Sequence, residues 1–151
     1  MSRPALLDVN VLFALFFEEH IHHDVAHDWF SMERESGWAT CPLTENGFVR
    51  QASNPKYVTQ YKAPPSTAFA ALGLLRQFCA SGHHAFWPDD VSLRELDLDT
   101  TRYFGHRHTT DLYLLALAVK NGGRLVTFDK TIPLPLLKQA KREHLEVLSL
   151  A

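Results

Sequence analysis

The sequence has few cysteines and no long apolar run, and both shortages limit what the protein can be. It contains 2 cysteines, Cys41 and Cys79, which form no Cys-x-x-Cys pair, so neither a disulfide framework nor a thiolate zinc site is expected. No stretch reaches the ~18 uninterrupted apolar residues of a membrane span. The first apolar segment also lacks the small-residue cleavage site of a signal peptide. A reducing cytoplasm is therefore the expected location.

The sequence also lacks an excess of positive charge. Its 15 Lys and Arg against 17 Asp and Glu leave a net charge of −2 at pH 7, which argues against nonspecific nucleic-acid binding by the whole surface. A local basic patch beside an acidic, metal-filled site remains compatible with this charge. The 46% of apolar and 21% of charged residues are ordinary for a globular protein, and 151 residues predict one domain over 1–151.

A carboxylate and a carboxamide interrupt the first apolar segment. Residues 5–7 predict a short buried strand and residues 11–17 predict a helix, so Asp8 follows the end of the strand and Asn10 comes two residues later. Parallel α/β sheets bind their ligands at the carboxyl ends of strands. From this segment alone, capping of the following helix explains Asp8 equally well.

Four histidines lie just after the first helix and at the start of a second one, which is predicted over about residues 24–35. They are His20, His22, His23 and His27. His23 and His27 are one helical turn apart and could reach the same ion, with His20 or Asp24 as the third ligand that zinc would need. Surface histidines are commoner than zinc sites, so we favour the solvent-exposed interpretation.

A second carboxylate stands at another junction between a strand and a helix. Residues 38–41 predict a short strand that ends before Pro42, and Glu45 lies in the first turn of the next helix. The helix dipole favours an acidic side chain at this place without any function. Glu45 alone therefore does not identify a site.

Basic and aromatic residues are interleaved after that helix. Arg50 lies on the helix itself, and residues 56–65 are predicted to form a loop that carries Lys56 and Lys62 together with two tyrosines. Such side chains suit phosphate contact and base stacking with single-stranded RNA. Loops also carry such residues without any function, so both interpretations stay open.

The middle of the chain predicts one helix, one strand and a turn. Ser66 is expected to cap a helix that ends at about residue 79, and residues 84–87 predict a third strand. Asp89 and Asp90 follow as an adjacent acidic pair. Since consecutive side chains point apart, we favour a turn over a metal site here.

Asp111 opens a helix that is hydrophobic nearly all round. One stripe of the helix would be enough to pack on a sheet, yet Leu114, Leu117 and Ala118 add apolar surface on its other sides. Such a helix is buried in the core or at a subunit interface. The surplus surface predicts a homodimer.

The last third of the chain has another acidic residue at the end of a predicted strand. Residues 124–129 predict a strand that ends in Asp129, with Thr127 two residues before it. A helix is expected at about residues 136–142, and a final apolar strand at 145–150.

Five strands separated by helices predict a three-layer α/β fold with a mostly parallel sheet. In such a sheet the four junction acids converge on one edge, where carboxylates repel one another unless a cation neutralises them. These acids are Asp8, Glu45, Asp111 and Asp129. Oxygen ligands of this kind select Mg²⁺ or Mn²⁺, which serve phosphodiester chemistry. The sequence therefore predicts a metal-dependent phosphodiesterase.

Four segments carry these acids in a characteristic order and spacing. They are Leu7-Asp8-Val9-Asn10-Val11-Leu12, Cys41-Pro42-Leu43-Thr44-Glu45, Asp111 ahead of Leu115-Ala116, and Val126-Thr127-Phe128-Asp129. Together they resemble the PIN domain, and most closely the VapC-type toxins of prokaryotic toxin–antitoxin pairs. The resemblance covers nearly the whole chain.

The resemblance implies a role for each of these polar residues. The four acids would bind Mg²⁺, with Asn10 and Thr127 as supporting polar groups. It further implies an endoribonuclease, a homodimer, and inhibition by a cognate antitoxin whose tail enters the acidic groove.

Two other functions agree with parts of the pattern. A haloacid-dehalogenase-type phosphotransferase also begins with an aspartate after its first strand, but the second aspartate that it needs is here Asn10. A catalytically silent binding module with the same fold is the other alternative.

Overall fold

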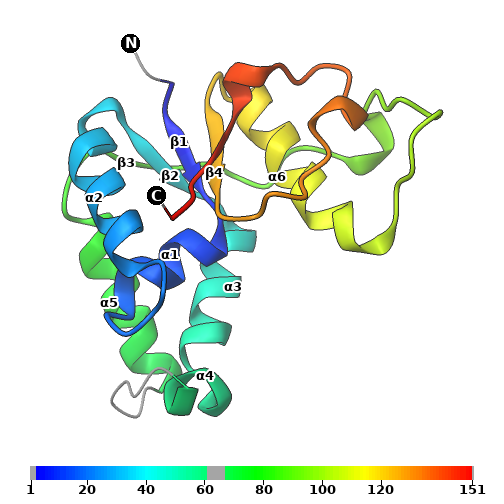
Figure 1. Ribbon diagram of the computed structural model, residues 1–151. Coiled ribbons are helices and arrows are strands. Elements are labelled where there is room, and N and C mark those ends of the chain that lie inside the picture. Colours follow the sequence, from blue (N-terminus) through cyan, green and yellow to red (C-terminus); the bar gives the residue numbers. More distant parts are fainter. Residues whose placement is uncertain (1–2, 61–66, 151) are drawn as a thin grey trace.

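A parallel sheet of five strands, in the order β3-β2-β1-β4-β5, forms the centre of the computed structural model (Figure 1). The structure describes residues 3–60 and 67–150, with only the backbone at 58–60. The strands are β1 (Ala5–Leu7), β2 (Trp38–Thr40), β3 (His84–Phe86), β4 (Arg124–Thr127) and β5 (Leu145–Val147). All four pairings between neighbouring strands are parallel. The predicted α/β class and the five-stranded sheet are confirmed.

Helices cover both faces of the sheet and complete three layers (Figure 1). They are α1 (Val9–Phe16), α2 (His23–Glu33), α3 (Pro42–Ala52), α4 (Pro55–Gln60), α5 (Ala68–Cys79) and α6 (Thr109–Lys120). Alternate strand residues face opposite layers. Ala5 and Leu7 therefore pack with α1, α2, α3 and α5, whereas Leu6 packs with α6. Across the described ranges, no helix is long and apolar enough to cross a bilayer.

The sequence predicts a dimer from surplus apolar surface on α6, and this reason is wrong. Leu114, Leu117 and Ala118 are at most 1% exposed and pack in the chain's own core, in the cluster that includes Leu6 and Leu125. Helix α6 is apolar on most sides because it packs on the sheet and also on segments that precede and follow it in the chain, which contribute Leu96 and Leu137 to the same cluster. Its surplus apolar surface is therefore already covered within one molecule.

The predicted loop over residues 56–65 is wrong where the structure describes it, because α4 begins at Pro55. The Asn54 side chain accepts a hydrogen bond from the backbone N–H of Lys56 at 3.0 Å. Proline at the first helical position needs no hydrogen-bond partner for its nitrogen, so Asn54-Pro55 starts a helix here rather than a loop. Lys62 lies outside the described residues.

The predicted helix at 136–142 is also wrong. Two short 3₁₀ turns, Leu134–Leu136 and Arg142–His144, replace it. Residues 136–138 bond to an earlier segment: the N–H of Asp99 donates to the carbonyl of Leu136, and the N–H of Lys138 donates to that of Asp97, both at 2.9 Å. Leu137 forms an isolated antiparallel bridge with Leu98, and the chain then turns at residues 138–139. These long-range bonds take up backbone groups that a helix at 136–142 would need for its own hydrogen bonds.

The other predicted elements agree with the structure to within three residues at either end. Ser66, the expected cap of α5, lies outside the described residues. Thr67 caps this helix instead, because its Oγ1 accepts a hydrogen bond from the N–H of Ala70 at 3.1 Å.

Candidate active site

Asp8 lies where β1 ends and α1 begins, as the sequence predicts. Its N–H continues the sheet by donating to the carbonyl of Val126 at 2.9 Å. Its Oδ1 accepts from the N–H of Val9 at 2.7 Å, and its Oδ2 accepts from Thr127 Oγ1 at 2.8 Å. Asp8 therefore caps the helix and also stands at the carboxyl edge of the sheet. Both carboxylate oxygens are held in place, and the residue is only 9% exposed.

Thr127, at the end of β4, joins the polar groups of this edge. Its hydroxyl donates to Asp8 and accepts from Asn10 Nδ2 at 3.1 Å and from the backbone N–H of Asp129 at 3.0 Å. Asn10 in turn accepts from the N–H of Phe128 at 3.2 Å through its Oδ1. The two residues predicted to support the site thus connect Asp8 to Asp129.

Asp111, in the first turn of α6, meets both of these aspartates. It hydrogen bonds to Asp129, and burial together with the negative charges of Asp8 and Asp129 raises its pKa to about 7. Burial also raises the pKa of Asp8, and the charge of Asp129 adds to this effect. The three aspartates are therefore close enough to make ionisation of all of them unfavourable without a cation.

Asp129 keeps its charge more easily than its neighbours do. Burial alone would raise its pKa, but hydrogen bonds from the side chain and backbone of Thr131 outweigh this effect. A hydrogen bond from Asp111 and the nearby His108 act in the same direction, so the pKa of Asp129 lies below its ordinary value. Asp129 therefore ionises at a lower pH than Asp111, and Asp111 keeps its proton until the pH approaches its pKa of about 7.

Glu45 forms its contacts elsewhere. Its Oε2 accepts a hydrogen bond from Thr40 Oγ1 at 2.7 Å, and the carboxylate belongs to a group with Cys79 and His84. The negative charges that raise the pKa values of Asp8 and Asp111 come from aspartates rather than from Glu45. The structure brings together three of the four predicted acids and gives the fourth different partners.

The three aspartates fit a hard divalent cation. They offer oxygen atoms alone, and burial together with repulsion within the group raises the pKa of Asp111. Mg²⁺ usually keeps several waters and takes one or two carboxylates, so a closed protein cage is not required. Within residues 3–60 and 67–150, the tightly clustered group of three ligand atoms, all within 4.8 Å of one another, is a different one: Glu45, Cys79 and His84.

The histidines at residues 20–27 contact neighbouring groups and one another, with 5.5 Å between the rings of His20 and His22 and 6.0 Å between those of His23 and His27. His23 Nδ1 is 2.7 Å from the carbonyl oxygen of Ala14, and His20 Nδ1 accepts from the N–H of His22 at 3.0 Å. The ring of His22 stacks on Phe128 at 4.2 Å. These contacts support the interpretation that the histidines are surface and packing groups rather than zinc ligands.

Asp89 and Asp90 also diverge. Asp89 accepts from the N–H of Leu43 at 3.1 Å and from the hydroxyl of Tyr113 at 2.9 Å, whereas Asp90 pairs with Lys120 at 3.1 Å. The turn interpretation of this pair is therefore supported.

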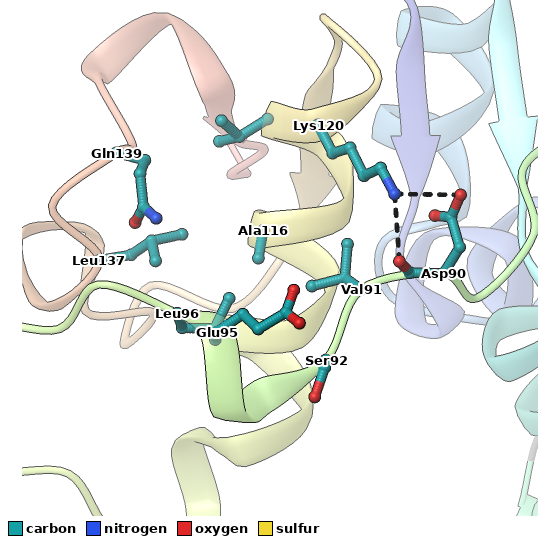
Figure 2. A pocket seen from close by; sticks show the side chains of 10 residues that line it. Asp90, Val91, Ser92, Glu95, Leu96, Ala116, Lys120, Leu137 and Gln139 are labelled. Atoms are coloured by element: carbon teal, nitrogen blue, oxygen red, sulfur yellow. Dashed lines mark hydrogen bonds and ion pairs between the residues drawn. The ribbon is translucent and has the colours of Figure 1, made fainter.

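The cavity drawn in Figure 2 is not lined by any of the predicted site residues. It has a volume of about 290 Å³ and lies between α6, residues 90–96 and residues 137–139. The ion pair of Asp90 with Lys120 stands at its rim (Figure 2). The acidic group lies outside this cavity, at the carboxyl edge of the sheet.

Exposed cationic and aromatic side chains are available to a polyanion. Arg50 and Lys56 are exposed, as the sequence interpretation requires. The segment before α6 adds Tyr103, which is 78% exposed, and Arg107. The sequence interpretation missed this segment, although it has the same mixture of basic and aromatic residues.

The family model described as PIN domain matches residues 5–134. The chain belongs to the PIN domain family. Three curated relatives from Mycobacterium tuberculosis cover most of it. Ribonuclease VapC44 is 41% identical over 95% of this chain and 99% of its own length. Ribonuclease VapC38 is 44% identical over 97% of this chain and 99% of its own length. Ribonuclease VapC39 is 46% identical over 85% of this chain and 90% of its own length. The family resemblance seen in the sequence is confirmed.

Proposed function

We propose that this PIN-domain protein is a metal-dependent endoribonuclease that hydrolyses RNA phosphodiester bonds. The observation that carries the proposal is the convergence of Asp8, Asp111 and Asp129 at one edge of the sheet, with a pKa of about 7 at Asp111. The names of the relatives support RNA as the substrate, since they are ribonucleases. A cytoplasmic location, where RNA is present, is part of the same proposal.

The aspartates would hold Mg²⁺, with Mn²⁺ as a substitute, and Glu45 is proposed as the fourth ligand. When bound, the ion supplies Lewis-acid polarisation of the phosphodiester and an acidified water. Thr127 and the N–H of Val9 orient the carboxylate of Asp8. Thr131 keeps Asp129 ionised through its two hydrogen bonds.

RNA contacts are proposed for exposed side chains of the described residues. Arg50, Lys56 and Arg107 offer positive charge, and Tyr103 offers a ring on which a base can stack. Lys62 stays a prediction from the sequence.

Cleavage of single-stranded RNA by the purified protein should require Mg²⁺ or Mn²⁺ and should stop in excess EDTA. Restoring either ion should restore cleavage, because the three aspartates are oxygen donors. The assay measures fragments on a gel, with p-nitrophenyl phosphate as a parallel substrate. Hydrolysis of this monoester alone would favour the phosphotransferase, and RNA binding without cleavage would favour the silent binding module. Undiminished RNA cleavage in EDTA would contradict the metal assignment.

The proposed biological role is that of the toxin in a toxin–antitoxin pair. Controlled expression of the chain should arrest the growth of a bacterial host, and co-expression of a small neighbouring gene should relieve the arrest. Colony counts after induction measure both effects, with Asp8→Asn as the inactive control. Harmless accumulation of protein that cleaves RNA in vitro would remove the toxin role and leave the nuclease.

A homodimer remains a proposal on new grounds. Large apolar side chains are exposed on α5 and on the edge strand β3: Phe69 is 90% exposed, Leu74 42% and Phe86 54%. Exposed apolar surface of this kind often marks an interface between proteins. Light scattering should give twice the mass of the chain at micromolar concentration, and the mass of a monomer would contradict the proposal.

A further inference from the structure

Three side chains from separate elements meet beside the end of β2. Glu45 comes from α3, Cys79 ends α5, and His84 begins β3. One ligand atom of each residue lies within 4.8 Å of the ligand atoms of the other two, and all three residues are partly exposed. None of the contacts of Asp8, Asp111 and Asp129 described above involves Cys79 or His84.

The hydroxyl of Thr40 holds this group together. Its Oγ1 lies 2.7 Å from Glu45 Oε2 and 2.8 Å from His84 Nε2. A hydroxyl has one proton, and an ionised carboxylate can only accept, so Thr40 donates to Glu45 and accepts from the Nε2–H of His84. In the neutral ring the lone pair of His84 is then on Nδ1. Since Thr40 is fully buried, the anchor of the group is fixed.

The donor set differs in kind from the aspartate group. It offers one sulfur, one imidazole nitrogen and one carboxylate oxygen, and sulfur and nitrogen donors select Zn²⁺ over Mg²⁺. Tetrahedral zinc with its usual bond lengths separates neighbouring ligand atoms by about 3.3–3.7 Å. The observed ligand atoms lie within 4.8 Å of one another, which is at most about 1.5 Å beyond the separations that tetrahedral zinc requires.

We propose that Glu45, Cys79 and His84 bind Zn²⁺, with water in the fourth position, and that zinc at this site inhibits the nuclease. Binding converts the Cys79 thiol to a thiolate and releases its proton to solvent. The inhibitory part depends on the proposed function, because zinc would withdraw Glu45 from the Mg²⁺ ligands. The binding part depends on the three side chains alone.

Cobalt replaces zinc in sites of this kind and reports the ligands by its colour. Titration of the reduced protein with Co²⁺ should produce a thiolate-to-cobalt charge-transfer band, which Zn²⁺ should displace. Cys79→Ser should abolish the band, and His84→Gln should weaken cobalt binding by at least about tenfold. The matched control is His27→Gln, an exposed histidine outside the group, and it should bind like the parent. Absence of the band in the parent, or its persistence in Cys79→Ser, would overturn the zinc site.

The second measurement tests inhibition. RNA cleavage in saturating Mg²⁺ is followed as Zn²⁺ is added, and each variant is compared with its own rate without zinc. Cys79→Ser should need at least about tenfold more Zn²⁺ for half inhibition than the parent or His27→Gln. Equal inhibition of parent and Cys79→Ser would place the zinc effect at the aspartates and overturn the inhibitory role. The cobalt spectrum requires no RNA cleavage, so failure of the nuclease proposal is seen separately from failure of the zinc site.

Discussion

Asp111→Asn should lower the rate of RNA cleavage by about 100-fold or more. The same variant should nevertheless melt at a higher temperature than the parent in EDTA at pH 8. The loss follows from the removal of one charged ligand from a site that binds a doubly charged cation. The gain in stability follows from the burial of the Asp111 carboxylate and from its repulsion by Asp8 and Asp129, because neutral asparagine avoids both costs.

The dependence on pH has a definite sign. The pKa of Asp111 is about 7 in the folded protein against 3.8 for an ordinary aspartate, so between these values the folded state holds a proton that the unfolded state has lost. The free energy of unfolding of the metal-free parent should therefore fall as the pH rises from 4 to 7. Asparagine removes this contribution, so the advantage of the variant should be large at pH 8 and nearly absent at pH 4.

The size of the stability effect is limited by solvent. A shift of this size corresponds to about 4 kcal/mol for a fully buried group. Since Asp111 is only half-buried, screening by water leaves about 1–2 kcal/mol. Each kcal/mol moves the melting temperature of a chain of this length by roughly 2–4 °C, so an increase of about 2–8 °C is expected.

Asp24→Asn is the matched control for this experiment. Asp24 also lies in the first turn of a helix, α2, but it is exposed and is not among the groups that shift the pKa values of Asp8, Asp111 and Asp129. The substitution removes the same charge and the same helix-dipole interaction. Melting curves and cleavage rates should match those of the parent. Near-parental cleavage by a folded Asp111→Asn variant at limiting Mg²⁺ would contradict the role of Asp111 as a ligand.

The aspartate group could be predicted from the sequence because each member has a local signal. Asp8 and Asp129 follow short apolar strands, and Asp111 opens the helix before a parallel strand, so the topology alone places them at one edge. The strands themselves could be predicted because short apolar runs are bounded by proline, glycine and charged residues.

The partners of Glu45 could not be predicted in the same way. Cys79 lies at the end of α5 and His84 at the start of β3, and their contact depends on how α5 packs on α3. No spacing within the sequence carries that information, so a search for Cys-x-x-Cys pairs and clustered histidines missed the group. The four histidines at residues 20–27 had a clear pattern in the sequence, but in the fold they hydrogen bond and stack with their neighbours, and the close group of ligand atoms among the described residues is formed by other side chains.

The predictions that the structure contradicts failed for a similar reason. The apolar sides of α6 suggested a second subunit, but segments before and after it in the chain cover them. The expected helix at 136–142 does not form because this segment hydrogen bonds instead with residues 97–99, about 40 positions earlier in the chain. Long-range contacts override local preference in both cases.

Thr127→Val should destabilise the protein and weaken its response to Mg²⁺, although valine has nearly the same shape as threonine. The hydroxyl of Thr127 is fully buried and serves three partners, namely Asp8, Asn10 and the N–H of Asp129. Valine has no hydroxyl, so these three groups would lose a hydrogen-bond partner. An unsatisfied buried polar group costs about 1–3 kcal/mol, so the melting temperature should fall markedly.

The same substitution should change the chemistry of Asp8. The hydrogen bond from Thr127 lowers the pKa of Asp8 and opposes the effect of burial, so its loss should raise this pKa further. A smaller fraction of Asp8 would then be ionised at neutral pH, and its carboxylate would also be free to rotate. Loss of such an orienting partner typically costs about 10–100-fold in metal affinity or activity. Cleavage by Thr127→Val should therefore need more Mg²⁺ and recover in part at higher pH.

Thr127→Ser separates the hydroxyl from the rest of the side chain. Serine keeps the donor to Asp8 and the acceptor for Asn10, and it removes only a methyl group. The serine variant should keep the Mg²⁺ dependence and pH profile of the parent, with a smaller loss of stability from the missing methyl. Cleavage rates over a Mg²⁺ series at several pH values, together with melting curves, measure both effects. A valine variant with the Mg²⁺ dependence of the parent would show that Thr127 acts in folding alone, since a purely structural role lowers the melting temperature without changing metal affinity.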